Sequence, residues 1–286
     1  MDNHLTRFDD RFGIPACETG SAPVFLLSAG WRSGSTLLQR LLGSSGELLM
    51  WGEPYGRAGL IPAMTRASFC LREEWPNEMH CRVPDAPERQ EAWIANMYPE
   101  PAALKASFRA QLDTLFAQPA AARGHQRWGI KEVRLQAMDA RFLRWIYPDA
   151  RFVFLLRSPW AAWSSAKGIP FYEQWPTRKV ETVQAFAAHW NKLALSFMQW
   201  PDDSGMIVRY EDLIRPGFNL QALADHCQLS HIDPTPLQHK IRGLRKEPSP
   251  LSPQEVSFIQ QVCGTACEVA GYRTPVVPGV GRPAVG

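Results

Sequence analysis

One short stretch constrains the fold of this chain more than any other. It contains an apolar run, Pro23–Ala29, a turn rich in glycine and serine, Gly30–Thr36, and then the helical pattern TLLQRLLGSS. A short continuous apolar run is typical of a strand buried in a parallel sheet. Glycines permit a tight turn, and backbone N–H groups at a helix N-terminus form a cradle for an anion. The stretch therefore predicts an α/β sheet with an anion site after its first strand.

Other strand and helix patterns alternate along the chain. We expect further strands at Leu48–Trp51, Trp128–Val133, Arg151–Leu156 and Met206–Val208, and helices at Glu88–Met97, Pro101–Gln118, Ala137–Tyr147, Pro159–Lys167 and Lys179–Trp200. Such alternation implies right-handed crossovers and a parallel sheet covered on both faces. We predict a single three-layer α/β domain over residues 1–273, with a helical insertion at about 57–125 and an extended or disordered tail at 274–286.

Composition excludes several kinds of protein. The net charge of +3 is lower than a nucleic-acid-binding face usually needs. No apolar run reaches the ~18 residues of a membrane-spanning helix, and the polar N-terminus does not resemble a secretory signal. Six scattered cysteines fit a reducing compartment better than a disulfide framework, so we expect a cytoplasmic protein. Cys263 and Cys267 have helical spacing but lack further ligands, which favours two buried thiols over a metal pair.

The turn after the first strand contains several groups that bind phosphate. Ser33, Ser35 and Thr36 carry hydroxyl groups, Gly34 permits close backbone approach, and Arg32 adds a forked, permanent charge. We expect all five to bind an anionic ligand, and we also expect Arg32 to act in catalysis. The alternative is a helix capped by a turn rich in serine and threonine.

This turn is not a nucleoside triphosphate loop of the Walker A type. Only three residues separate Gly30 from Gly34, and Ser35 stands where that motif has its lysine. The strand Arg151–Leu156 is followed by Arg157 rather than by an aspartate for magnesium. Both departures argue against a small-molecule kinase, which is the first alternative function.

Two stretches resemble the sulfotransferases that use 3′-phosphoadenosine 5′-phosphosulfate (PAPS). PVFLLSAGWRSGSTLL is similar to their loop for the 5′-phosphosulfate group, and RFVFLLRSPWAAWSSAKG to their strand, loop and helix for the 3′-phosphate. Arg157 and Ser165 match the arginine and serine of the second motif, with Ser164 as a neighbouring alternative. The resemblance implies a P-loop-like α/β sandwich and a PAPS site without a metal. A surface ion pair is the alternative role for Arg157.

The resemblance extends to two candidate catalytic residues. The turn GEPYGR is similar to the one that holds a catalytic glutamate in tyrosylprotein and some carbohydrate sulfotransferases, which implies that Glu53 is the general base. WGIKE is similar to the strand that brings a lysine to the leaving group, which implies that role for Lys131. The alternatives are a solvated Glu53, edge-strand charges at Lys131 and Glu132, and a histidine base such as His80 or His125.

The segment VRYEDL also resembles a family segment, so we expect Tyr210 to contact the nucleotide, with structural support as the alternative. The sequence thus predicts an enzyme that moves a sulfuryl group from PAPS to a hydroxyl, for which a small metabolite or natural product is favoured. A catalytically inactive nucleotide-binding module is the second alternative. We expect no nucleic-acid or membrane partner, and a homodimer is compatible with the sequence. Without an acceptor, residues 57–80 and 169–178 should be the least ordered.

Overall fold

The computed structural model describes residues 4–14, 22–54, 58–68, 90–91, 101–169, 180–239 and 248–275. Within them, five parallel strands form one sheet in the order β2-β3-β1-β4-β5. The strands are β1 Val24–Ser28, β2 Leu48–Trp51, β3 Arg127–Glu132, β4 Arg151–Leu156 and β5 Gly205–Arg209. The predicted α/β class and parallel sheet are therefore confirmed.

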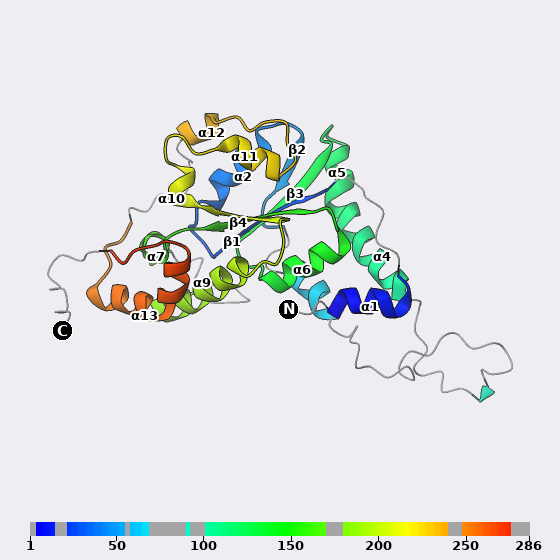
Figure 1. Ribbon diagram of the computed structural model, residues 1–286, viewed down its shortest axis with the longest axis horizontal. Coiled ribbons are helices and arrows are strands. Elements are labelled where there is room, and N and C mark those ends of the chain that lie inside the picture. The colour runs from blue at the N-terminus through cyan, green and yellow to red at the C-terminus, as the bar shows by residue number, and fades with distance from the viewer. Residues whose placement is uncertain are drawn as a thin grey trace.

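Helices cover both faces of the sheet, so the fold has three layers (Figure 1). The layer drawn above the sheet contains α2 Ser35–Gly43, α10 Tyr210–Leu213, α11 Leu220–His226 and α12 Thr235–Gln238. The layer drawn below contains α1 His4–Phe12, α6 Ala137–Ile146, α9 Val183–Met198 and α13 Pro253–Val269. The remaining helices are α3 Leu60–Ser68, α4 Pro101–Leu112, η4 Asp113–Ala117, α5 Gln118–Ala121 and α7 Pro159–Ala166.

The core divides along the sheet because successive side chains of a strand point to opposite faces. In β1, Leu26 belongs to the apolar cluster that contains α2, whereas Phe25 and Leu27 belong to the cluster that contains α6 and α9. All five residues of β1 are buried, as expected for a central strand. The first strand therefore holds the loop that follows it against a rigid base.

The position of β3 corrects one alternative from the sequence. Lys131 and Glu132 do not lie on an edge strand, because β3 pairs with β2 on one side and with β1 on the other. Both residues are buried, with 6% and 5% of their surface exposed. Charged side chains are rarely buried this deeply without partners.

The helix predicted at Pro101–Gln118 continues to Ala121 through a π-helical turn at Asp113–Ala117. Pro119 explains the wider turn, because proline has no N–H to donate and its ring crowds the carbonyl of Leu115. The predicted start of the long helix at Lys179 is wrong. Within the described residues α9 begins at Val183, where the Thr182 hydroxyl accepts a hydrogen bond from the Ala185 amide.

Some of the other predicted elements agree with the structure and others do not. Strands β2 and β4 have the predicted bounds, whereas helices α1, α3, α11 and α12 were not predicted. Helix α3 also shows that residues 60–68 are regular, although the sequence suggested an irregular segment from 57 to 80. Residues 69–80, 170–178 and 276–286 lie outside the described residues, as does most of the helix predicted at Glu88–Met97. Those predictions stay untested.

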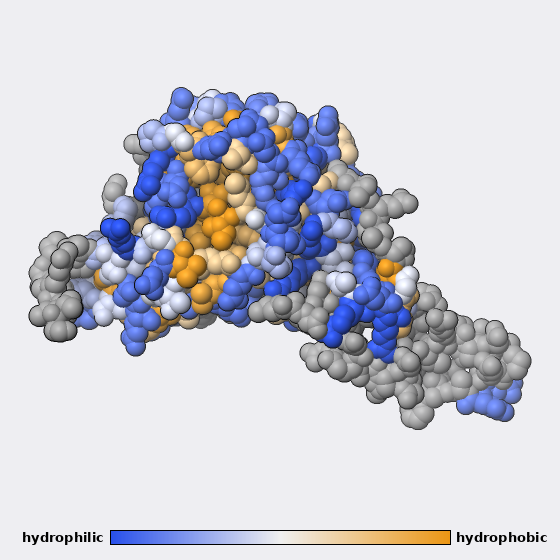
Figure 2. All heavy atoms as spheres, in the orientation of Figure 1, coloured by the Kyte–Doolittle hydropathy of each residue, from blue (hydrophilic) through white to orange (hydrophobic). Residues whose placement is uncertain are grey.

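The surface in view carries apolar side chains at its centre, surrounded by polar ones (Figure 2). Strand β5 is an edge strand, and its Ile207 side chain is 43% exposed. Among the described residues, no helix has both the length and the apolar character needed to cross a membrane.

Candidate active site

The loop after β1 has the backbone geometry of an anion-binding concavity. Gly30, Arg32 and Gly34 have positive φ angles of 89°, 60° and 90°, and they alternate with residues of ordinary φ. Such alternation turns successive N–H groups toward one point. Gly34 caps α2 without a side-chain hydrogen bond, and within the described chain the amides of residues 32–36 donate to no backbone carbonyl. The loop therefore presents free donors at a helix N-terminus.

The side chains of this loop have different surroundings. Ser33 is buried and its hydroxyl contacts that of Ser28, so it braces the loop from behind. Ser35 is also buried, whereas Thr36 is exposed. A Cβ at Gly34 would collide with the ring of Tyr210, so glycine is required for this close approach as well as for its φ angle.

The loops after β1 and β4 contact each other through the residues that the sequence predicted. Arg157 Nη1 donates to the carbonyl of Arg32 at 2.5 Å, and Arg32 Nε donates to Ser165 Oγ at 3.0 Å. The Arg157 guanidinium lies over the Tyr210 ring, 4.7 Å from its centroid. The alternative serine, Ser164, instead donates to the carbonyl of Ser249. The fold thus brings Arg32, Arg157, Ser165 and Tyr210 together.

Two guanidinium groups lie close together here without a direct counter-charge. Neither Arg32 nor Arg157 forms an ion pair with a carboxylate within the described residues, which contradicts the surface ion pair considered for Arg157. Burial lowers the pKa of Arg157 from its ordinary value. Its Nε is buried and has no hydrogen-bond partner in the described chain. A buried donor without a partner is costly, and an anion would satisfy it.

The loop after β4 is held by contacts that the sequence did not reveal. Glu211 accepts one hydrogen bond from the Ser158 amide at 2.9 Å and another from the Tyr272 hydroxyl at 3.0 Å. Trp190 Nε1 donates to the carbonyl of Arg157 at 3.0 Å. These contacts link β4 to α9, α10 and the end of α13, and they fix the backbone of Arg157.

A second group of charges lies at the same carboxyl edge of the sheet, around β2 and β3. Lys131 Nζ lies 2.5 Å from Glu53 Oε1, so the predicted base and the predicted leaving-group cation are in contact. Arg134 joins them, with its Nη2 atom 3.5 Å from Glu53 Oε2 and 2.5 Å from Glu132 Oε1. The sequence analysis missed Arg134, although its position three residues after Lys131 placed it just beyond the same strand.

The histidines lie in different places relative to this group of charges. His125 precedes β3 at the amino edge of the sheet, about 20 Å from Lys131 at the usual strand rise, and its Nδ1 atom lies 2.9 Å from the Gly46 carbonyl oxygen. His125 is therefore excluded as the base at this site. His80 lies outside the described residues. His189 of α9 is buried beside the loop after β1, with its ring 5.1 Å from that of Trp31, so it supports the loop as a packed residue.

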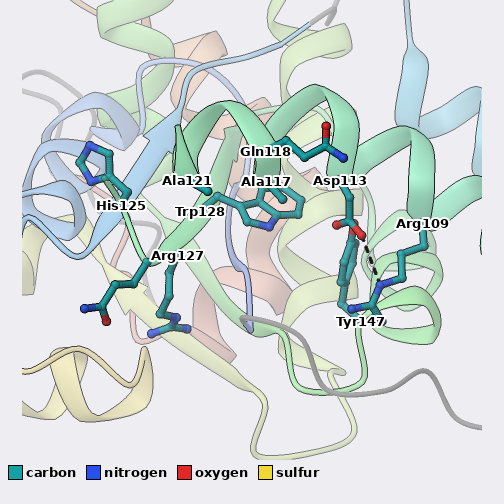
Figure 3. Close-up of a pocket in the computed structure, with 10 residues that line it drawn as sticks. Arg109, Asp113, Ala117, Gln118, Ala121, His125, Arg127, Trp128 and Tyr147 are labelled. Carbon is teal, nitrogen blue, oxygen red and sulfur yellow. Dashed lines mark hydrogen bonds and ion pairs between the residues drawn. The ribbon is translucent and has the colours of Figure 1, made fainter. Parts of the chain in front are cut away.

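The amino edge of the sheet also carries a hollow of about 340 Å³. Figure 3 shows Arg109, Asp113, His125, Arg127 and Tyr147 around it, with Arg109 paired to Asp113. Arg127 is occupied by backbone carbonyls, among them that of Ala22 at 2.7 Å. Ligands of open α/β sheets bind outside the carboxyl ends of the strands, so this hollow is separate from the candidate site.

Among the described residues, the cysteines and acidic side chains form no second candidate site. Cys263 and Cys267 are free buried thiols, and burial raises the pKa of each to about 12. In the parts of the chain that the structure describes, no three His, Cys, Asp or Glu side chains are placed to hold a metal ion.

Comparisons with known proteins identify the family of the chain. The model of the family described as "Sulfotransferase family" matches residues 23–233. The sulfotransferase domain from the curacin biosynthetic pathway is 16% identical, with a TM-score of 0.51 over 90% of this chain and 100% of that one. The corresponding domain of the olefin synthase of Synechococcus PCC 7002 is 17% identical, with a TM-score of 0.46 over 92% and 98%. No curated protein matches.

Proposed function

Because the chain belongs to the sulfotransferase family, we propose that it transfers a sulfuryl group from PAPS to the hydroxyl of a small metabolite or natural product. Membership also argues against the small-molecule kinase that the sequence left as an alternative. The donor, the acceptor class and the roles of individual residues are the content of this proposal.

The observation that carries the proposal is the convergence of two guanidinium groups beside free loop amides. Arg157, Ser165 and Arg32 are joined by hydrogen bonds between the two loops, and within the described chain neither arginine has a carboxylate partner. PAPS carries one phosphate on the 3′ oxygen of its ribose and another, linked to the sulfuryl group, on the 5′ oxygen. A protein that binds it therefore needs two anion sites close together. The loop amides of residues 32–36 suit the 5′ group, and Arg157 with Ser165 suits the 3′-phosphate.

The second group of charges suits the transfer step. PAPS supplies a sulfuryl group that is activated by its link to the 5′-phosphate. Glu53 accepts the proton of the acceptor hydroxyl while that oxygen bonds to sulfur. Lys131 neutralises the negative charge that the broken sulfur–oxygen bond leaves on the 5′-phosphate, and Arg32 adds charge on the same side. Tyr210 lines the nucleotide side of the loop against Gly34.

The proposal is tested by incubating the purified chain with sulfur-35-labelled PAPS and a panel of hydroxyl acceptors. The panel contains phenols, aliphatic alcohols, sugars and a tyrosine peptide, and each reaction runs with and without a metal chelator. We expect labelled product from a small-molecule alcohol or phenol in both conditions. Transfer only to the peptide would contradict the acceptor class. Nucleotide binding without turnover on any acceptor would favour the inactive module.

A further inference from the structure

The Glu53 carboxylate lies between two cations that reach it from β3 and the turn after it. Lys131 Nζ is 2.5 Å from Oε1, and Arg134 Nη2 is 3.5 Å from Oε2. Glu53 itself lies beyond the end of β2, in an irregular turn, and its side chain is 27% exposed. A glutamate in such a turn has several rotamers available. A separate cation for each oxygen restricts the carboxylate to one orientation.

Arg134 is itself fixed by a different residue. Its Nη2 atom lies 2.5 and 2.7 Å from the two oxygens of Glu132, and its Nε atom lies 3.0 Å from Oε1. Glu132 is buried at the carboxyl end of β3, and burial raises its pKa while Arg134 opposes that rise. A forked guanidinium held by a buried carboxylate is rigid. Arg134 therefore keeps its place whether or not Glu53 is beside it.

Lys131, unlike Arg134, has two negatively charged groups to interact with during the proposed reaction. In the structure it is paired with Glu53, but the proposed function also requires its charge at the leaving 5′-phosphate. A lysine turned toward a phosphate holds its former partner less tightly. The base then needs another cation to keep its position while the acceptor binds.

We propose that Arg134 is a positioning residue, anchored by Glu132, which holds the carboxylate of Glu53 in place while Lys131 serves the leaving group. The inference rests on the proposed function, because it assumes that Glu53 is the base. Arg134 acts through Glu53 and does not itself touch the substrate.

The test compares Arg134→Met and Arg134→Lys with a control, Arg144→Met, which removes a half-buried arginine paired with Asp202 outside the site. With the best aliphatic alcohol of the acceptor panel, Arg134→Met should lower kcat by about 10–100-fold, the scale of effect expected for a misplaced reacting group. Its affinity for 3′-phosphoadenosine 5′-phosphate should stay within about twofold. Arg134→Lys should recover part of kcat, and the control should change neither quantity. Equal losses of kcat and nucleotide affinity would overturn the proposal.

A double replacement separates this inference from the assignment of the base. Glu53→Gln with Arg134→Met should be no slower than Glu53→Gln alone, since Arg134 acts only through Glu53. Additive losses would mean that Arg134 acts elsewhere. If Arg134→Met fails to fold because Glu132 is left buried and unpaired, Glu132→Gln with Arg134→Met removes both charges and takes its place.

A structural readout does not depend on turnover. In crystals of the Arg134→Met variant with 3′-phosphoadenosine 5′-phosphate, the Glu53 carboxylate should leave the place it occupies in the unaltered protein with the same nucleotide. An unmoved carboxylate would refute the positioning role. Full activity of Glu53→Gln would instead refute the base, whatever the crystals show.

Discussion

At the scale of single residues, the two groups of charges differ in how they are balanced. Arg32 and Arg157 lie together without a carboxylate partner in the described chain, whereas Lys131 and Arg134 alternate with Glu53 and Glu132. An unbalanced pair of cations favours a bound anion, and a balanced cluster favours exact placement of its members. The first group suits binding of the donor and the second suits catalysis.

Replacement of Glu53 tests catalysis apart from binding. Glu53→Gln keeps the shape of the side chain but removes the proton acceptor, so turnover should fall by about 10²–10⁴. Affinity for 3′-phosphoadenosine 5′-phosphate, measured by calorimetry, should barely change. Glu268→Gln, on the exposed face of α13, is the matched control. Activated phenols should rescue part of the lost rate, because their acidic hydroxyls need less help from a base. No loss of rate with an unactivated alcohol would place the base elsewhere.

Replacement of Arg157 tests recognition of the 3′-phosphate. Arg157→Ala should weaken binding of 3′-phosphoadenosine 5′-phosphate by about 1.5–3 kcal/mol, the usual contribution of hydrogen bonds to a charged group. Binding of adenosine 5′-phosphate, which lacks the 3′ group, should change much less. Calorimetry with both nucleotides measures the difference. Equal losses for the two nucleotides would assign Arg157 to another part of the ligand.

At the scale of elements, the loop after β1 depends on contact between two segments distant in the sequence. Gly34 ends the loop after β1, and the Tyr210 ring, which begins α10, occupies the space where a Cβ would lie. The same ring stacks on Arg157 of the loop after β4. Three loops thus share one aromatic contact, and a change in one should disturb the others.

Gly34→Ala tests this coupling, with Gly46→Ala as its control. Both glycines have positive φ, so each replacement incurs strain of about 1–2 kcal/mol, but only Gly34 has a neighbour in the way. Gly34→Ala should displace Tyr210 and weaken binding of 3′-phosphoadenosine 5′-phosphate by more than about tenfold. Gly46→Ala should lower stability alone. Similar affinities for the two variants would show that the packing of Tyr210 on Gly34 is unimportant for binding.

At the scale of the whole molecule, the proposed donor site joins segments that are distant in the sequence. Residues of the loops after β1 and β4, of α7 and α10, and of the segment just after α13 meet around Arg157. Tyr272 lies beyond residue 233, where the match to the family model ends, and yet it supports the loop after β4 through Glu211. A ligand at this site should therefore stabilise the entire fold.

Thermal unfolding measures that effect. At a concentration of about 100 times its dissociation constant, 3′-phosphoadenosine 5′-phosphate should raise the free energy of unfolding by about 2.7 kcal/mol. The unfolding midpoint should rise by several degrees, to the same extent with and without a metal chelator, because arginine and amide groups supply the counter-charge. A rise that disappears with chelator would show that the nucleotide needs a metal ion.

Local patterns determined most of the framework. Buried strands β1 and β4 are runs of apolar residues, and β2 and β4 were predicted with their observed bounds. The loop Gly30–Thr36 could be predicted from its glycines and its serine and threonine residues, because these residue types favour a tight turn whatever the rest of the chain does. Helices α3 and α11 were missed because each is short and depends on packing against the domain rather than on a strong local pattern.

The sequence by itself predicted the α/β class, most of the strands and the glycine-rich loop from local patterns, and the family resemblance added Glu53, Lys131 and Arg157 as candidate site residues. Only the tertiary structure decided which charges face each other. Arg134 acquired its place through Glu132 and Glu53, and His125 was excluded by lying at the opposite edge of the sheet. The pairing of strands and the burial of charges arise from contacts between distant segments. Such contacts follow from the packing of the entire chain, and no local pattern encodes them.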